Sequence, residues 1–155
     1  MKTPKYVFDT NVFINMQRHH PADIFGSLWQ QVGALIDDNS VVSSEEVLGE
    51  IKIGDDYLVD WTKSRKEAFL KSDEKTQRLV RDILSKYAEL VTGSKKTNGA
   101  DPFVIALAKL KNCTLVTDES RSGVGQPPKI PNVCEAYDVR CIKFVEFLRE
   151  SKIAI

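Results

Sequence analysis

The feature that most constrains the fold is a short apolar run that ends in an acid and leads directly into a second apolar pattern. Tyr6–Phe8 run into Asp9, and a helical pattern of apolar residues begins at Val12. The first run predicts a buried strand and the second predicts a helix. Open α/β sheets bind ligands at the carboxyl ends of their strands, where Asp9 would lie. Taken alone, however, Asp9 is better explained as an N-cap for the amides of Asn11 and Val12.

Apolar runs that predict strands alternate with helical patterns along the whole chain. Further buried strands are predicted at Val41–Val42, Cys113–Thr117 and Val139–Ile142. Helices are predicted over 12–17, 22–36, 43–51, 56–69, 73–91, 101–110, 130–137 and 144–151. This alternation predicts an α/β fold with a central, mainly parallel sheet of about four to five short strands flanked by helices. With no linker or repeat in the sequence, we expect residues 1–155 to form a single domain.

The composition excludes several classes of protein. The 22 basic and 22 acidic residues balance, so a nucleic acid would have to be bound by a local basic patch. No apolar run approaches the roughly 20 residues of a membrane span, and the N-terminus shows no secretory signal. We therefore expect no membrane association.

The cysteines and histidines narrow the chemistry further. Cys113, Cys134 and Cys141 are odd in number and contain no C-x-x-C pair, which favours reduced, mostly buried thiols in a cytoplasmic protein. The only histidines, His19 and His20, are adjacent and precede a proline, which favours a surface turn. A Ser-His-Asp or Cys-His hydrolase mechanism is therefore not expected.

Acids recur at the junctions between predicted strands and helices. Asp9 follows the first strand, Asp101 starts a helix together with Pro102, and Asp118–Glu119 end the Cys113 strand. The helix after the second strand carries Glu46 and Glu50, and Ser43-x-x-Glu46 matches a capping box. Several carboxylates at one sheet edge repel one another unless a cation lies among them. All-oxygen sites select Mg²⁺ or Mn²⁺, which can polarise a phosphodiester and activate a water.

Four segments that contain these acids resemble the signature segments of PIN-domain ribonucleases in order and spacing. They are Phe8–Asn11, Glu50–Ile51, Ala100–Ala106 and Leu115–Glu119. The resemblance spans nearly the whole chain and includes the toxins of bacterial toxin–antitoxin pairs. The tail, over 130–134 and 139–142, is more similar to an uncharacterised PIN-like subfamily than to the typical toxins.

The resemblance implies a PIN-like domain and a Mg²⁺- or Mn²⁺-dependent endoribonuclease whose acids bind the metal. By position, Asp9, Glu50 and Asp101 are the first three acids. Glu46 is an alternative to Glu50, but the predicted capping box already uses it. PIN domains usually carry Thr-x-Asp after the last buried strand, which places Glu119 at the fourth position and leaves Asp118 as the alternative ligand. Asn11 and Thr117 resemble the polar residues that orient the first acid or a metal-bound water.

The resemblance also implies partners. RNA is the expected substrate, and Lys95, Lys96, Arg121 and Lys129 are the candidate contacts to its phosphates. If the chain is a toxin, a protein antitoxin is expected, and the resemblance to the toxins implies a homodimer. The alternative is a PIN-like interaction domain with little or no catalysis, which the glutamate at the fourth position and the neutral net charge leave open.

Overall fold

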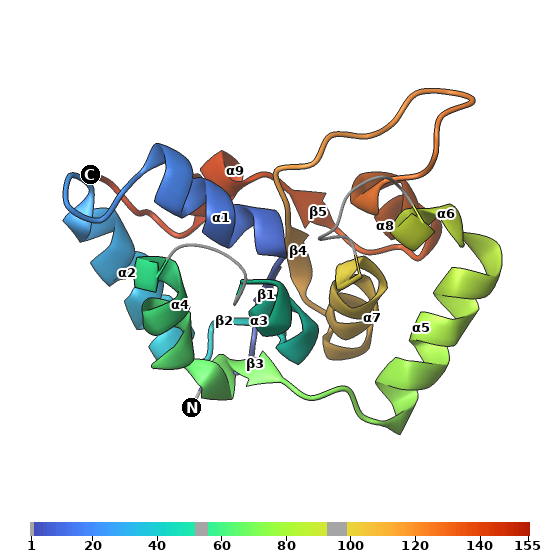
Figure 1. The fold of residues 1–155 in the computed structure, drawn as a ribbon, viewed down its shortest axis with the longest axis horizontal. Coiled ribbons are helices and arrows are strands. Elements are labelled where there is room, and N and C mark those ends of the chain that lie inside the picture. The colour runs from blue at the N-terminus through green and yellow to red at the C-terminus, as the bar shows by residue number, and fades with distance from the viewer. Residues whose placement is uncertain (1, 52–55, 93–98) are drawn as a thin grey trace.

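Five strands form one sheet in the order β3-β2-β1-β4-β5, and each neighbouring pair is parallel (Figure 1). The structure is a computed structural model and describes residues 2–51, 56–92 and 99–155. The strands are β1 Tyr6–Phe8, β2 Val41–Ser44, β3 Phe69–Leu70, β4 Thr114–Val116 and β5 Cys141–Ile142. The predicted α/β class with a parallel, helix-flanked sheet is confirmed and is consistent with a PIN-like fold.

Helices connect the strands and cover both faces of the sheet. They are α1 Thr10–His19, α2 Gly26–Asp37, α3 Glu45–Ile51, α4 Asp56–Lys63, α5 Glu74–Lys86, α6 Glu89–Thr92, α7 Asp101–Lys111, α8 Ile130–Ala136 and α9 Phe144–Glu150, with a 3₁₀ turn, η1, at Lys66–Ala68. Figure 1 shows α7 on one side of the sheet and α1 and α2 on the other. Helix α5 packs on α7 as an outer layer.

The alternation of side chains along β1 explains the two layers. The Phe8 ring meets the rings of Phe13, Phe144 and Phe147 edge-to-face, which joins β1 to α1 and α9. Successive strand residues point to opposite faces, so Val7 lies on the face that α7 covers. All of these side chains are buried, which fixes the register of β1 and therefore the position of the residue that follows it.

One predicted helix, 56–69, is wrong in its second half. Helix α4 ends at Lys63, η1 follows, and Phe69 and Leu70 form the edge strand β3, which pairs with Ser43 and Ser44 of β2. The Phe69 ring packs 5.6 Å from the Phe13 ring, and this burial outweighs the local helical pattern. The predicted helix over 73–91 is likewise interrupted, because α5 ends at Lys86 and α6 begins at Glu89.

The predicted capping box at Ser43 is also wrong. The Ser43 hydroxyl donates a hydrogen bond to the Phe8 carbonyl at 2.6 Å, so Ser43 belongs to the sheet. The Ser44 hydroxyl accepts a hydrogen bond from the Val47 amide at 3.4 Å, one residue later than predicted. Helix α2 begins at Gly26 rather than at residue 22, because the Phe25 amide closes a turn on the Pro21 carbonyl at 2.8 Å.

The three cysteines are free thiols, with Cys113 and Cys134 buried and Cys141 half-buried, as the sequence predicted. Within the described residues, no helix combines the length and the apolar character that a bilayer span requires.

Candidate metal centre

Three carboxylates from distant parts of the chain meet at the carboxyl edge of the sheet. Asp9 follows β1, Asp101 is the first residue of α7, and Glu119 lies just beyond β4. One oxygen of each lies within 4.8 Å of the others, and we refer to these three residues as the acid cluster. Asp9 and Asp101 are buried and Glu119 is half-buried. Negative charges this close in a partly dry site repel one another unless a proton or a cation offsets them.

Asp9 is held by a hydrogen bond to each carboxylate oxygen. Its Oδ1 accepts a hydrogen bond from the Thr10 amide at 2.8 Å, and its Oδ2 accepts one from the Thr117 hydroxyl at 2.9 Å. Asp9 therefore caps α1 through Thr10, whereas the sequence pointed to the amides of Asn11 and Val12. Each oxygen keeps further lone-pair capacity, so capping does not prevent metal binding.

The surroundings of Asp9 favour its protonated form. Burial, followed by the negative charge of Glu119, raises the pKa of Asp9 to about 7, and Glu50 adds a smaller upward effect. The hydrogen bonds from Thr117 and Thr10 act in the opposite direction. A nearby cation would favour the ionised form. Near neutral pH, a proton and a metal ion would therefore compete for Asp9.

Two polar side chains connect the ends of β1 and β4. The Asn11 carboxamide donates to the Thr117 hydroxyl oxygen at 3.2 Å and accepts from the Asp118 amide at 3.0 Å. The Thr117 oxygen also accepts from the Glu119 amide at 3.2 Å, while its proton goes to Asp9. These contacts fix Asp9 and Glu119 relative to each other.

Glu50, in the last turn of α3, lies at the border of the site and outside the acid cluster. Its Oε1 accepts a hydrogen bond from the Thr10 hydroxyl at 2.6 Å, and its Oε2 accepts one from the Ala100 amide at 3.0 Å. Burial is the main cause that raises the pKa of Glu50. Glu50 thus ties α3 to the starts of α1 and α7, next to Asp9 and Asp101. Glu46 is half-buried one turn earlier and is likewise outside the cluster.

Asp118 and Glu119 have different partners. Asp118 accepts hydrogen bonds from the Asn15 side chain at 3.0 Å and from the Phe144 amide, at the start of α9, at 3.2 Å. Glu119 accepts one from the Ile130 amide, at the start of α8, at 3.3 Å, while the same carboxylate belongs to the acid cluster. The structure therefore brings Glu119 to the cluster and uses Asp118 to hold α9.

The predicted phosphate contacts have mixed outcomes. Lys95 and Lys96 lie outside the described residues. Arg121 is exposed and forms an ion pair with Glu135. Lys129 is exposed at the start of α8. Contacts between these residues and RNA phosphates stay a prediction.

A cleft of about 220 Å³ adjoins the acid cluster on the β4–β5 side. Its lining includes Glu119, Ser120, Arg121, Cys141, Lys143 and Glu146. The Lys143 amine donates a hydrogen bond to the Ser120 hydroxyl at 2.7 Å. Lys143 was not identified as a candidate from the sequence. Lys143 follows the last strand directly, and this is the same position relative to a strand that Asp9 has.

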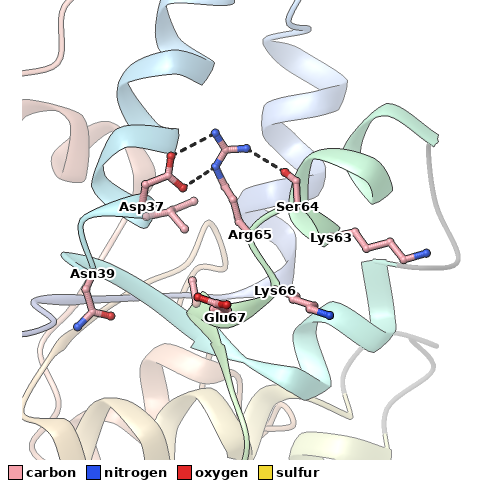
Figure 2. A pocket seen from close by; sticks show the side chains of 9 residues that line it. Asp37, Asn39, Lys63, Ser64, Arg65, Lys66 and Glu67 are labelled. Atoms are coloured by element: carbon pink, nitrogen blue, oxygen red, sulfur yellow. Dashed lines mark hydrogen bonds and ion pairs between the residues drawn. The ribbon is translucent and has the colours of Figure 1, made fainter. Parts of the chain in front are cut away.

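A second hollow, of about 290 Å³, lies at the opposite edge, before β2 and β3. Figure 2 shows the Arg65 guanidinium reaching Asp37 and Ser64 there. Arg65 Nε lies 3.1 Å from Asp37 Oδ1, and the guanidinium carbon lies 4.4 Å from the centroid of the Trp61 ring. A Cβ on Gly33 would come within 2.9 Å of Arg65 Nη2, so the glycine leaves room for the ion pair. Arg65 and Asp37 neutralise each other, so we interpret their contact as structural.

A family model described as "Domain of unknown function (DUF4411)" matches residues 6–155. The chain belongs to this family. No curated protein matches the chain. Among solved structures, it is similar to the crystal structure of FitAcB from Neisseria gonorrhoeae, with a TM-score of 0.50 and 20% identity over 88% of this chain and 96% of that chain. This likeness supports the fold alone, so the function of this DUF4411 member has to be argued from its site.

Proposed function

We propose that this chain is a Mg²⁺- or Mn²⁺-dependent endoribonuclease that hydrolyses phosphodiester bonds in RNA. The observation that carries this proposal is the acid cluster, three carboxylates whose oxygens lie within 4.8 Å of one another. Sites built from oxygen alone favour hard divalent cations. RNA as the substrate rests on the resemblance of the acid-bearing segments to PIN-domain ribonucleases.

The spacing of the cluster fits such a cation. Ligands at about 2.1 Å from an octahedral Mg²⁺ are separated by about 3 Å when adjacent and about 4 Å when opposite. The limit of 4.8 Å between the cluster oxygens is slightly wider, so small side-chain adjustments would complete the site. With three carboxylates as ligands, the remaining positions would be left for water and substrate oxygens.

The residues of the site would have separate roles. Asp9, Asp101 and Glu119 would hold the cation, which when bound would polarise the phosphodiester and make a water more acidic. Thr117 would orient Asp9 through its hydrogen bond of 2.9 Å. Glu50 would position the start of α7, and with it Asp101, through the Ala100 amide. Asn11 would keep the ends of β1 and β4 in register.

Two measurements on purified protein test this function. Calorimetric titration should detect Mn²⁺ binding whose affinity increases as the pH rises through about 7, because binding displaces the proton from Asp9. Incubation with single-stranded RNA and Mn²⁺ should give cleavage that a chelator stops and that Asp9→Asn removes. Unchanged cleavage by Asp9→Asn would exclude the proposed mechanism.

An interaction domain with little catalysis is the second candidate. The observation in its favour is that Glu119 already accepts a hydrogen bond from the Ile130 amide, which could fix its carboxylate without any metal. Titration of Asp101→Asn with Mn²⁺ separates the candidates. A metal site should lose affinity in this variant, whereas a scaffold that binds no Mn²⁺ would behave the same with and without the change.

A toxin role, with an antitoxin and a homodimer, rests on the resemblance to PIN-domain toxins. A small neighbouring open reading frame whose product copurifies with this chain and stops RNA cleavage would support the role. Sedimentation analysis of the chain alone tests the homodimer. A monomer that cleaves RNA would retain the nuclease and remove the dimer from the proposal.

A further inference from the structure

We propose that the cleft beside Glu119 binds a phosphate of the RNA strand next to the scissile one, and that Lys143 and Ser120 are its ligands. This inference rests on the proposed nuclease function and names part of the substrate path. The cleft shares Thr117 and Glu119 with the candidate metal centre, so a strand lying over the metal would continue into it.

The two ligands are held on a rigid frame. Ser120 follows Glu119 directly, and Lys143 follows β5 directly. The Thr117 amide donates to the Ile142 carbonyl at 3.0 Å, and Asp118 accepts from the Phe144 amide at 3.2 Å. Figure 1 shows the chain between β5 and α9 passing beside the end of β4. The backbone on both sides of Lys143 is therefore tied to the backbone that carries Glu119.

Of the charged residues that line the cleft, Lys143 is the best candidate to bind a phosphate. Arg121 also lines the cleft, but its guanidinium is paired with Glu135. Among the ion pairs of the described residues, none includes Lys143, which is exposed and contacts a neutral hydroxyl. Glu146 lines the same cleft and would repel a phosphate, as would Glu119 without its metal. A phosphodiester beside these acids needs a local positive charge.

The small volume of the cleft suits part of a polymer better than a whole enclosed ligand. Its volume of about 220 Å³ is below the range of about 300–1,000 Å³ that is usual for pockets enclosing a small molecule. Ile142 and Pro131 supply apolar lining beside the polar pair. A phosphate on Lys143 and Ser120 with its sugar over this apolar lining would occupy the cleft without a pocket for a base. We therefore expect binding that depends little on RNA sequence.

The test measures RNA binding apart from cleavage. A fluorescent single-stranded oligoribonucleotide is titrated by anisotropy in EDTA with Asp9→Asn protein, alone or combined with Lys143→Gln or Lys109→Gln. Lys109 is a matched exposed lysine in the last turn of α7, about 12 Å along the helix from Asp101. We expect Lys143→Gln to weaken binding by about three- to ten-fold and to reduce the slope of log K against log salt by about 0.7. Lys109→Gln should change neither.

Kinetics in the otherwise native chain provide a second readout. With Mn²⁺ and RNA, Lys143→Gln should raise KM more than it lowers kcat, Lys143→Arg should restore most of the affinity, and Ser120→Ala should have a smaller effect. If Lys143→Gln matches Lys109→Gln in both affinity and salt slope while the native chain cleaves RNA, the cleft assignment is overturned and the nuclease function stands. If the native chain neither binds Mn²⁺ nor cleaves RNA, both fail together.

Discussion

Charged side chains are arranged in opposite ways at the two edges of the sheet. At the amino ends of the strands, two pairs of opposite sign form: Lys2 Nζ is 3.1 Å from Asp38, and Arg65 Nε is 3.1 Å from Asp37. At the carboxyl ends, Asp9, Glu50 and Glu119 gather without an ion pair among the described residues. The first arrangement needs nothing further, whereas the second is balanced only when a proton or a cation is added.

The free energies associated with Asp9 and with the Arg65–Asp37 ion pair support this distinction. Raising the pKa of Asp9 from 3.8 to about 7 corresponds to roughly 4 kcal/mol of preference for the protonated form. The Arg65–Asp37 pair is partly exposed, and such pairs contribute about 0–1 kcal/mol to the free energy of unfolding. At neutral pH the carboxyl edge therefore lowers the stability of the metal-free fold more than the Arg65–Asp37 pair raises it. A buried carboxylate whose pKa is raised by desolvation and by a specific neighbouring charge is a candidate for a functional site.

Matched Asp→Asn changes at the two edges should separate activity from stability. Asp9→Asn removes a proposed metal ligand, and we expect cleavage to fall by more than about 100-fold, because losing only a hydrogen-bond partner of a ligand costs about 10- to 100-fold. The free energy of unfolding without metal at pH 7.5 should rise by about 1–3 kcal/mol, because the charge repulsion is gone. The asparagine keeps a side-chain oxygen that can accept the hydrogen bond from the Thr10 amide, so the cap of α1 is retained.

Asp37→Asn is the control for this comparison. It breaks the pair with Arg65, so we expect unfolding free energy to fall by at most about 1 kcal/mol and cleavage to stay at the native level. Urea denaturation and an RNA cleavage assay measure both quantities. A loss of stability in Asp9→Asn would contradict the expected charge repulsion, because asparagine caps a helix about as well as aspartate and the change removes only the charge.

The pH dependence of stability should differ between the two edges as well. The folded chain holds a proton on Asp9 up to about pH 7, whereas the unfolded chain releases it near pH 4. Between these values the folded state binds more protons, so the stability of the metal-free protein should fall as pH rises from about 4 to about 7 and then level off. Asp38 has a lowered pKa, mainly because its hydrogen bonds from Ser40 outweigh burial, so its contribution is lost only as pH falls below about 4.

Thermal unfolding in EDTA from pH 4 to 8 measures this decline. It should be strongly reduced in Asp9→Asn and unchanged in Asp37→Asn. Saturating Mn²⁺ should also remove it, because the ion replaces the proton. A flat profile in the native chain would mean that Asp9 is ionised at low pH and that the carboxyl edge carries little repulsion.

The alternation of apolar runs in the sequence was enough to predict β1, β2, β4 and β5 and the edge at which the acids lie. It could not predict β3, because Phe69 and Leu70 are too few to show a two-residue period. Only their packing against residues far away in the chain makes them a strand. The sequence from 56 to 69 therefore carries a continuous helical pattern, which tertiary contacts interrupt after Lys63.

The same limit applies within the site. The acids at the junctions between strands and helices include Asp9 and Asp101, which do lie together. Glu119 rather than Asp118 joins the acid cluster, because Asp118 is held by Asn15 and by the Phe144 amide, 26 residues away from Asp118. The local sequence around these two acids does not show such contacts.

The smallest expected effect comes from Gly33→Ala in α2, at the amino edge. Alanine in place of glycine inside a helix stabilises by up to about 1 kcal/mol. The added Cβ would lie 2.9 Å from Arg65 Nη2, so the guanidinium must shift from Asp37 and from the Trp61 ring, at a cost of similar size. We expect a net change in the free energy of unfolding within about 1 kcal/mol, and native cleavage.

In an Arg65→Gln background the obstacle is absent, and Gly33→Ala should stabilise by close to the full amount, about 1 kcal/mol, that alanine contributes inside a helix. Urea denaturation of the four proteins in this cycle measures the coupling. A coupling of zero would show that Arg65 moves aside without loss, whereas impaired cleavage would show that the two edges are connected.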